Sequence, residues 1–313
     1  MKKSSPKILI LGVTASGKSA LAFELSKAIG AEIISVDSMK VYRRMDIGTA
    51  KPPVEKQKLI PYHLIDVVEP SEAFSVDKFL DLTEQAIDDI QSRGKPVVAV
   101  GGTAMYIKAL LFGLFDGPGS DETIRNRLQK SANEVGLESL HQKLQQVDPE
   151  AAERIHPNDE KRIVRALEVY EITGKPISHF QKQWEAEHPS GDWTVIGLRR
   201  EKDIESQRMN ARVKKMIEAG LRDEVAALLA EEKPLSQQAA AAIGYAEMIA
   251  HLNGDMELDE TVERIKINTR RFAKSQRTWF KTFRNVNWID ITETDTVETV
   301  LEKTLKLLNQ FNP

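Results

Sequence analysis

The sequence GVTASGKS, residues 12–19, fits the phosphate-loop pattern G-x-x-x-x-G-K-[ST]. In such a loop, backbone N–H groups surround phosphate oxygens, the lysine reaches the outer phosphates and the last hydroxyl binds Mg²⁺. The apolar run KILIL precedes the loop and the helical pattern SALAFELSKAIG follows it, which is the strand and helix context that the motif requires. The sequence therefore predicts a site for a phosphorylated ligand, but the loop alone does not name the reaction.

Strand and helix patterns alternate after this loop. EIISVD (residues 32–37) and PVVAVGG (96–102) are typical of buried strands, and FLDLTEQAIDDIQSRG (79–94) is typical of a helix. This order predicts an α/β fold, namely a phosphate-loop NTPase-like core with a parallel sheet whose ligands lie at the carboxyl ends of the strands. Asp37 and a pair of glycines come at those ends.

Two clusters of helix breakers divide the chain. GLFDGPGS (113–120) and HPSGD (188–192) flank a region with helix patterns and no convincing strand. We predict a catalytic core of residues 1–115 and 193–313 and a helical insertion of residues 116–192. The second part of the core is expected to hold a strand at 193–198, a long helix from about 258 to 283 and a last strand at 286–290.

Composition excludes several classes of function. The 313 residues carry a net charge of -3, which gives no general attraction to nucleic acid or membrane, so local clusters must be considered separately. The absence of cysteine excludes disulfides, thiolate metal sites and a cysteine nucleophile. The apolar run near the start breaks at Gly12, and no stretch approaches the roughly 18 apolar residues of a membrane span. A soluble, cytoplasmic protein is expected.

Asp37 is the candidate general base. It lies at the end of an apolar strand in SVDSMKVYRRMDIGTAKP (35–52), where a carboxylate facing the phosphate loop can deprotonate or orient a nucleophile. The alternative is a helix N-cap, with Asp37 or Ser38 capping SMKVYRRM. The two roles are compatible, and the spacing alone leaves both open.

The segment VGGTAMYIKALL (100–111) places two glycines and Thr103 between a strand and a helix. The glycines allow close backbone approach, and Thr103 either bonds what approaches or caps the helix, of which local sequence favours the cap. This strand ends in glycines where ordinary NTPases have a carboxylate that helps to hold Mg²⁺. The metal is therefore expected on Ser19 and on the diphosphate itself.

Basic residues gather in two places. In PNDEKRIVRALEVYEITGKP (157–176), three basic residues share one helix edge while apolar residues face inward, and surface charge without function competes evenly with a grip on a polyanion. The segment 264–284 holds eight Lys or Arg and no acid, with a predicted stripe of Arg270, Lys274, Arg277 and Lys281 opposite aromatic residues expected in the core. This second segment favours a polyphosphate chain as partner.

At this point seven ordered segments match a known family. The sequence resembles bacterial tRNA dimethylallyltransferases, also called isopentenyl-tRNA transferases, over nearly its whole length. The resemblance rests on GVTASGKS, DSMKVYRRMDIGTAKP, YHLIDVVEP, VGGTAMYIKALL, RIHPNDEKRIVRALEVYEITGKP, AAIGYAE and TRRFAKSQRTWF.

The resemblance implies a fold and a reaction. Members of the family have a phosphate-loop core with a helical insertion that clasps the anticodon stem-loop of tRNA. They transfer the dimethylallyl group of dimethylallyl diphosphate, with Mg²⁺, to N6 of the adenosine 3′-adjacent to the anticodon. By this resemblance the loop holds a diphosphate that departs from carbon, and the adenine leaves its stack to enter the site.

The resemblance also implies roles for individual residues. The catalytic residues are Asp37 as general base, Thr103 and Arg212. The diphosphate site is Gly12, Val13, Thr14, Ala15, Ser16, Gly17, Lys18 and Ser19, with Ser19 also the metal ligand. The tRNA contacts are Asp37, Ser38, Met39, Lys40, Thr103, Arg125, Lys161, Arg162, Ile163, Val164 and Arg165. Without the resemblance, the local sequence favours ion pairs of Arg208 and Arg212 with nearby acidic residues.

Several positions depart from the usual family pattern. Lys40 stands where glutamine is usual, Arg44 and Ala104 where glycine is, Val13 where proline is common, and Ser275 where a basic residue is. Lys40 matters most, because an ammonium cannot accept a hydrogen bond from a base edge as a glutamine amide can.

Two other functions compete with RNA prenyl transfer. A small-molecule kinase would use Asp37 to orient an acceptor hydroxyl and the insertion as a lid, which leaves the basic segment 264–284 unexplained. A nucleotide-gated RNA-binding module would bind tRNA with a steep salt dependence and tolerate loss of Asp37. A tRNA clamp built from one chain needs no partner, so a monomer is expected.

Overall fold

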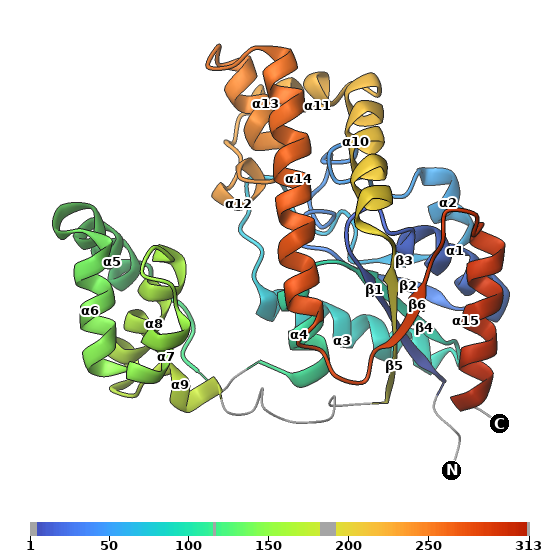
Figure 1. Ribbon diagram of the computed structural model, residues 1–313, viewed down its shortest axis with the longest axis horizontal. Coiled ribbons are helices and arrows are strands. Elements are labelled where there is room, and N and C mark those ends of the chain that lie inside the picture. The colour runs from blue at the N-terminus through green and yellow to red at the C-terminus, as the bar shows by residue number, and fades with distance from the viewer. Residues whose placement is uncertain (1–4, 115–116, 182–191, 312–313) are drawn as a thin grey trace. The chain divides into compact units, whose positions relative to one another are not determined.

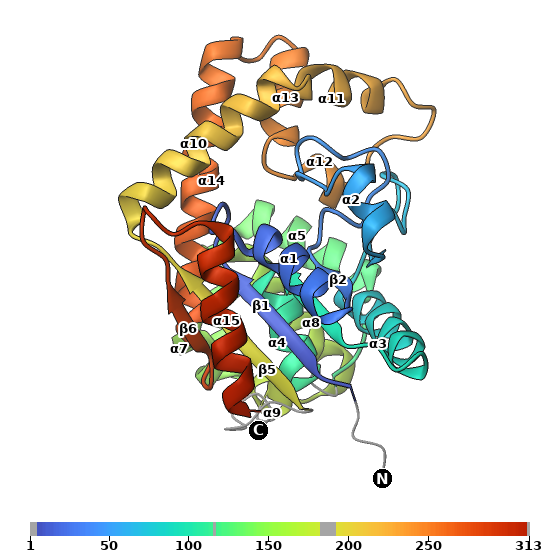
Figure 2. The ribbon, with the colours of Figure 1, turned by 90° about the vertical axis from the view of Figure 1, so that its right-hand side faces the viewer.

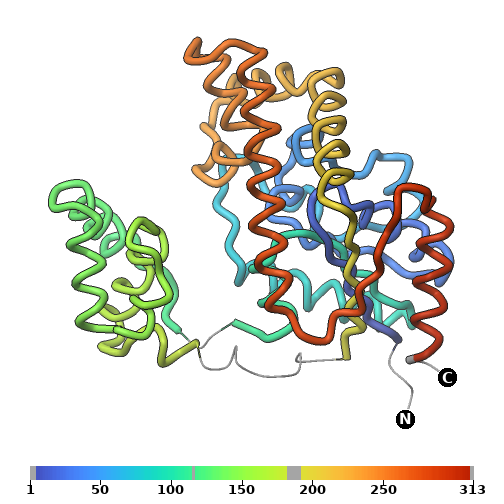
Figure 3. Tube along the Cα trace, in the orientation of Figure 1, coloured from blue at the N-terminus to red at the C-terminus, as the bar shows by residue number. Residues whose placement is uncertain are grey.

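A computed structural model describes residues 5–114, 117–181 and 192–311. The chain divides into two compact units, Met1–Leu111 with Pro189–Pro313, and Phe112–His188 (Figure 3). Residues 115, 116 and 188–191, parts of the two predicted breaker clusters, lie outside the described residues.

The first unit is built on one six-stranded sheet in the order β3-β2-β4-β1-β5-β6, and every pairing is parallel (Figure 1). The predicted α/β fold with a parallel sheet is confirmed. Only the two-residue edge strand β3 was not anticipated. The strands are β1 (Lys7–Gly12), β2 (Glu32–Val36), β3 (Tyr62–His63), β4 (Val97–Gly101), β5 (Trp193–Arg199) and β6 (Asn287–Asp290).

The register of the sheet aligns the segments that carry the predicted chemistry. Leu11 of β1 lies opposite Gly101 of β4, and Gly101 lies opposite Val36 of β2. The residues that follow these three are the start of the phosphate loop, Gly102 and Asp37. All three segments therefore leave the sheet at the same edge, which is where parallel sheets bind their ligands.

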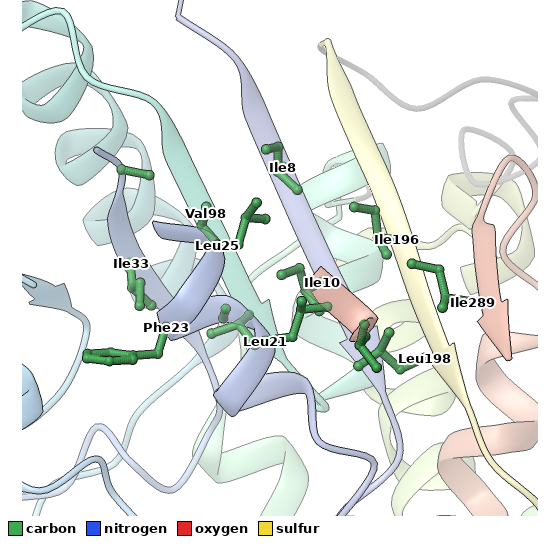
Figure 4. Packing of buried hydrophobic residues seen from close by; sticks show 14 of the residues in the cluster. Ile8, Ile10, Leu21, Phe23, Leu25, Ile33, Val98, Ile196, Leu198 and Ile289 are labelled. Carbon is green, nitrogen blue, oxygen red and sulfur yellow. The ribbon is translucent and has the colours of Figure 1, made fainter. Parts of the chain in front are cut away.

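Side chains alternate across β1 and fill a core on each face of the sheet. Ile8 and Ile10 pack with Leu21 and Leu25 of α1 (Lys18–Ile29) (Figure 4). Val300 and Leu308 of the last helix, α15 (Val297–Phe311), belong to the same cluster. Burial of one such aliphatic side chain contributes about 1.5–3 kcal/mol. Figure 2 shows α1 and α15 on this face. The rigid layer fixes the direction in which the phosphate loop leaves β1.

The remaining helices of the first unit lie before and after the insertion. The helical region after β5 breaks at Gly220, which has a φ of 95°, and forms two helices, α10 and α11. α10 packs along α14, and α15 was not anticipated. The helices are α1 (Lys18–Ile29), α2 (Val54–Leu59), α3 (Val76–Ser92), α4 (Ala104–Phe112), α10 (Lys202–Glu218), α11 (Leu221–Leu229), α12 (Gln237–Ala240), α13 (Tyr245–Leu252), α14 (Leu258–Phe280) and α15 (Val297–Phe311).

The second unit is helical in its described part and has its own apolar core. Leu128, Leu140, Leu144, Ile163 and Leu167 are all buried in it. Its helices are α5 (Glu122–Val135), α6 (Leu137–Val147), α7 (Pro149–Arg154), α8 (Glu160–Thr173) and α9 (Ile177–Phe180).

Candidate active site

The phosphate loop forms a tight turn between β1 and α1. Ala15 and Gly17 have φ angles of 65° and 104°, and the N–H of Ser16 donates to Val13 O at 3.1 Å. Left-handed conformations of this kind turn successive N–H groups toward one side of the chain. The first N–H groups of α1, at Lys18 and Ser19, have no partner within the helix and add to an anion site.

Two arginines donate hydrogen bonds to carbonyl oxygens of the phosphate loop. The Nε of Arg208 donates to Ala15 O at 2.9 Å, and the Nε of Arg200 donates to Ser16 O at 3.1 Å. Within the described residues, Arg208 forms no ion pair with an acid, so the pairing suggested by local sequence is wrong for it. Because these carbonyls are occupied by guanidinium groups, the loop presents N–H groups to a ligand. Arg200 was not predicted, since nothing in its local sequence points to residues 184 positions away.

The loop opens into a cavity of about 380 Å³ that lies within the first unit. The phosphate loop, the segment after β2, the turn after β4 and the helices α10 and α14 all line it. The structure thus brings together most of the residues predicted for the core: Thr14, Lys18, Ser19, Asp37, Ser38, Met39, Lys40, Thr103 and Arg212. A second cavity of about 340 Å³ on the loop shares Lys18, Ser19 and Arg212 and adds Arg208 and Lys215.

Asp37 is half-buried and uses one carboxylate oxygen to shape its own loop. Its Oδ1 accepts from the N–H groups of Met39 at 2.9 Å and Lys40 at 3.2 Å. Residues 38–45 form turns, so the helix that Asp37 was expected to cap is absent from this described segment, although the capping bonds exist. Among described residues no group donates to Oδ2. Asp37 therefore keeps one oxygen for a ligand in the cavity.

Three basic side chains and one carboxylate line this cavity, so basic groups outnumber acidic groups in its lining. Burial, followed by repulsion from Arg212 and Lys40, lowers the pKa of Lys18 to about 7, while Asp37 acts in the opposite direction. Burial also lowers the pKa of Lys40 and of Arg212, and the charge of Asp37 again opposes the shift. The negative charge of a bound diphosphate would favour the charged forms of these three basic groups.

The two glycines at the end of β4, Gly101 and Gly102, allow the close approach that was predicted. A Cβ on Gly101 would lie 1.9 Å from Val36 O, and one on Gly102 would lie 2.5 Å from Nε2 of Gln276. Thr103 differs from the prediction that it caps α4. Its hydroxyl accepts from Ser38 N–H at 3.1 Å, and among the described residues it forms no hydrogen bond to an N–H of α4. Thr103 thus joins the turn after β4 to the Asp37 segment.

Sequence reasoning missed the anchor of the loop that follows Asp37. The carboxylate of Glu224 on α11 accepts from the N–H groups of Asp46, Ile47 and Gly48 at 2.7–3.2 Å, and from the hydroxyl of Tyr245 at 2.6 Å. Tyr245 belongs to the segment AAIGYAE, which was singled out without a role for any one residue. Glu224 thus holds two residues that line the cavity, Gly48 and Tyr245, from a helix far along the chain.

One departure from the usual family pattern has a structural explanation. Arg44 has a φ of 60°, a conformation that costs little only for glycine. Its guanidinium pairs with Glu69 at 2.6 Å and with Glu231 at 2.7 Å. These ion pairs offset the backbone strain that glycine would avoid.

The predicted basic stripe of α14 is only half exposed. Arg270 donates to Asn210 Oδ1 at 2.6 Å and Arg277 pairs with Glu205, so both guanidiniums are bound to α10. Lys274 and Lys281 are exposed. Of the aromatic residues expected in the core, Phe280 and Phe283 are buried, but Phe272 is 42% exposed and lines the cavity.

The second unit divides the predicted tRNA contacts into exposed and buried residues. Lys161 and Arg162 are exposed, whereas Ile163 and Val164 are buried in the core of this unit, so their side chains cannot contact RNA. Side-chain contact with RNA is therefore expected from the exposed pair and not from the buried pair, because a helix edge that is polar at two positions turns inward at the next two.

The other two predicted contacts of this unit, Arg125 and Arg165, bind the buried Glu168 at 3.0 and 2.8 Å. Glu168 also accepts from the N–H of Asp121 at 2.8 Å. Burial raises the pKa of Glu168, but the hydrogen bonds from Arg165, Asp121 and Arg125 outweigh it and hold the pKa below its usual range. Glu168 thus joins α8, which carries Arg165, to the start of α5, where Asp121 and Arg125 lie.

Replacing Glu168 by glutamine is expected to lower the free energy of unfolding by about 2 kcal/mol, because charge-assisted hydrogen bonds to two guanidiniums are lost. Glu171→Gln, on the same helix and paired with exposed Arg127 and Lys143, is the control, with an expected loss below about 1 kcal/mol. Urea unfolding of the full chain, followed by circular dichroism, measures both.

The pH dependence of the same variant checks the cause. Because the folded pKa of Glu168 is depressed, its stabilisation is present above the ordinary glutamate pKa and is lost as the pH falls through the folded value. The difference in unfolding free energy between wild type and Glu168→Gln should therefore shrink in acid. Equal losses in the two variants at neutral pH would contradict the role of Glu168.

Membrane-spanning helices and side-chain clusters for a metal ion are both absent from the part of the chain that the structure describes. No helix within residues 5–114, 117–181 and 192–311 combines the length and apolar character of a membrane span. The same residues hold no group of three or more His, Cys, Asp and Glu side chains suited to a metal ion.

Comparison with known proteins gives consistent matches. The family model described as IPP transferase matches residues 40–283. The chain is 47% identical to a tRNA dimethylallyltransferase of Geobacter metallireducens over 283 residues, 90% of this chain and 92% of that protein. It is 44% identical to a tRNA dimethylallyltransferase of Acetivibrio thermocellus over 305 residues, 97% of each chain.

Solved structures give the same result. The full-length tRNA isopentenylpyrophosphate transferase of Bacillus halodurans is 39% identical, with a TM-score of 0.72 over 98% of this chain and 97% of that one. A eukaryotic dimethylallyltransferase acting on tRNA is 29% identical, with a TM-score of 0.82 over 98% of this chain and 79% of that one.

Proposed function

This chain belongs to the IPP transferase family, and from that membership we propose how its residues carry out the reaction. Its activity is that of a tRNA dimethylallyltransferase. It transfers the dimethylallyl group of dimethylallyl diphosphate to N6 of the adenosine 3′-adjacent to the anticodon and releases diphosphate. The observation that supports the residue roles is the single cavity lined by Lys18, Asp37 and Arg212.

In this proposal the phosphate loop holds the leaving group. N6 of the adenine attacks the allylic carbon, the C–O bond breaks, and its electron pair leaves with the diphosphate. Lys18, Arg212 and the loop N–H groups stabilise the charge that develops on the departing oxygen. Oδ2 of Asp37 accepts the N6 proton. No phosphoryl group moves, which agrees with a strand β4 that ends in glycines rather than in a metal-binding carboxylate.

Mg²⁺ is part of the proposal, and the donor set of the site fits it. Ser19 is exposed in the first turn of α1 and lines both cavities. Mg²⁺ commonly binds through few protein groups together with substrate phosphates and water, so one hydroxyl beside a diphosphate suits it. When bound, the ion would neutralise charge on the leaving group.

The tRNA would meet exposed cations and the mouth of the cavity. The exposed cations available to phosphates are Lys161 and Arg162 of the second unit, Lys274 of α14 and Lys281 just after that helix. The adenine enters beside Thr103, Ser38, Met39 and Lys40, which line the cavity with Asp37. Arg125 and Arg165 act mainly by shaping the second unit. The clasp of the anticodon stem-loop by the insertion is part of this proposal, and we place the reaction in the cytoplasm with one chain per tRNA.

The mass of tRNA after incubation tests this function. With Mg²⁺ and dimethylallyl diphosphate, unmodified tRNA should gain one five-carbon isoprenyl unit per molecule, located on the adenosine 3′ of the anticodon. Consumption of ATP with unchanged tRNA mass would instead select a kinase. Binding of tRNA without any mass change would select a non-catalytic RNA-binding protein.

A further inference from the structure

Gln276 of α14 reaches the phosphate loop from the far end of the sequence. Its side-chain oxygen Oε1 accepts from Thr14 N–H at 2.9 Å, and its Nε2 donates to Gly102 O at 2.7 Å. Gln276 is 3% exposed. One buried carboxamide therefore links the loop that holds the leaving group to the turn after β4.

The link continues to the candidate base. Gly102 is followed by Thr103, whose hydroxyl accepts from Ser38 N–H at 3.1 Å, and Ser38 follows Asp37. A connected path thus runs from Thr14 through Gln276 to the segment that carries the carboxylate. Gly102 has no room for a side chain, because a Cβ there would lie 2.5 Å from Nε2 of Gln276 and 3.5 Å from Nζ of Lys18.

We propose that Gln276 is a positioning residue that fixes the spacing between the diphosphate loop and the Asp37 segment. This inference rests on the proposed prenyl transfer. In that reaction the leaving oxygen and the attacking nitrogen lie on opposite sides of one carbon, so the two loops that hold them must keep a fixed separation. Hydrogen bonds at both ends of one short side chain, part-buried at Thr14 and buried at Gly102, set such a separation.

The chemistry of a carboxamide suits this position. One end must accept from an N–H and the other must donate to a carbonyl, and a carboxamide offers both in one planar group that does not titrate. A glutamate would place an acceptor against Gly102 O, and a methionine would leave the part-buried N–H of Thr14 and the buried carbonyl of Gly102 without this partner. Each unpaired group of this kind costs about 1–3 kcal/mol and favours movement of the backbone.

Single-turnover kinetics of Gln276→Met test the proposal. The enzyme is mixed in excess with labelled tRNA at saturating dimethylallyl diphosphate and Mg²⁺, and prenylated tRNA is counted over time. We expect the rate constant for transfer to fall by about tenfold to a hundredfold, the consequence of a misplacement near 1 Å, with the amplitude retained. The dissociation constants for tRNA and for inorganic diphosphate should change by less than about threefold, since the contacts to each substrate remain.

Gln91→Met is the matched control, because Gln91 also donates from a carboxamide to a backbone carbonyl, Ser5 O, but lies outside the cavity. Its rate constant should equal that of wild type. Gln276→Glu, which keeps the size and the Oε1 acceptor, should lower the rate constant as Gln276→Met does.

The rate constant separates positioning from a purely structural role. A structural role would lower the folded fraction, measured by circular dichroism, and leave the rate constant of the folded enzyme at saturating concentration unchanged. A rate constant within twofold of wild type in both Gln276 variants would overturn the proposal while the transfer activity itself stood. Absence of transfer by wild type would instead overturn the proposed function.

Discussion

Asp37→Asn is expected to lower the single-turnover rate constant for prenyl transfer by about 10²–10⁴-fold, the usual contribution of a general base. The amide keeps an oxygen that can accept from Met39 and Lys40 N–H, so the loop retains its shape. It cannot take up the N6 proton. The measurement is quenched-flow sampling of tRNA mass with saturating substrates.

Binding measurements complete this test. The affinity of Asp37→Asn for tRNA and for inorganic diphosphate should be close to that of wild type, because the lost function concerns a proton. Asp46→Asn, in the same loop but outside the cavity and paired with Lys51, is the control and should transfer at the wild-type rate. A rate constant near wild type in Asp37→Asn would remove this residue from the mechanism.

Lys18→Met is expected to lower the same rate constant by about 10²–10³-fold, comparable to the loss of one preorganised donor to a developing negative charge. The ammonium lies beside the phosphate loop and donates to Val13 O at 3.1 Å. Its loss should also weaken diphosphate binding, measured by calorimetry. Unchanged transfer with a neutral side chain at this position would contradict a diphosphate site in the loop.

The pH dependence of diphosphate binding provides a second check on Lys18. Because burial, Arg212 and Lys40 lower its pKa to about 7, about half of the free protein carries a charged Lys18 at that pH. As the pH rises above 7, affinity should fall by up to about tenfold per pH unit, since only the charged form attracts the anion. Lys18→Arg stays charged and should lack this dependence. Parallel pH profiles for the two proteins would contradict the assignment.

The parts of the site that follow strands could be predicted from sequence. The apolar runs before Gly12, Asp37 and Gly102 indicate buried parallel strands, and the ends of such strands meet at one edge. The sheet register confirms this alignment. Local patterns therefore sufficed for the fold, the phosphate loop and the place of the candidate base.

The parts of the site held by distant contacts could not be predicted. Gln276 and Arg200 bond the phosphate loop across 262 and 184 residues, and Glu224 bonds backbone N–H groups 176–178 residues away. No periodicity or capping pattern encodes such pairs. Thr103 shows the related limit of local reasoning, because a residue placed to cap a helix instead bonds another loop.

The insertion shows where a family match needs a structure. The run from Lys161 to Arg165 was predicted as one RNA-contacting segment, but helix geometry turns Ile163 and Val164 into the core and binds Arg165 to Glu168. Only burial separates residues that can touch RNA from residues that hold the unit together.

The bond that breaks in dimethylallyl diphosphate tests the central claim most directly. The substrate is prepared with a heavy oxygen isotope in the position that bridges carbon and phosphorus, and both products are analysed by mass spectrometry. If the loop holds a leaving group that departs from carbon, tRNA gains an isoprenyl unit and all of the heavy oxygen appears in the released diphosphate. Heavy oxygen in the tRNA, or transfer of a phosphoryl group to it, would contradict the account.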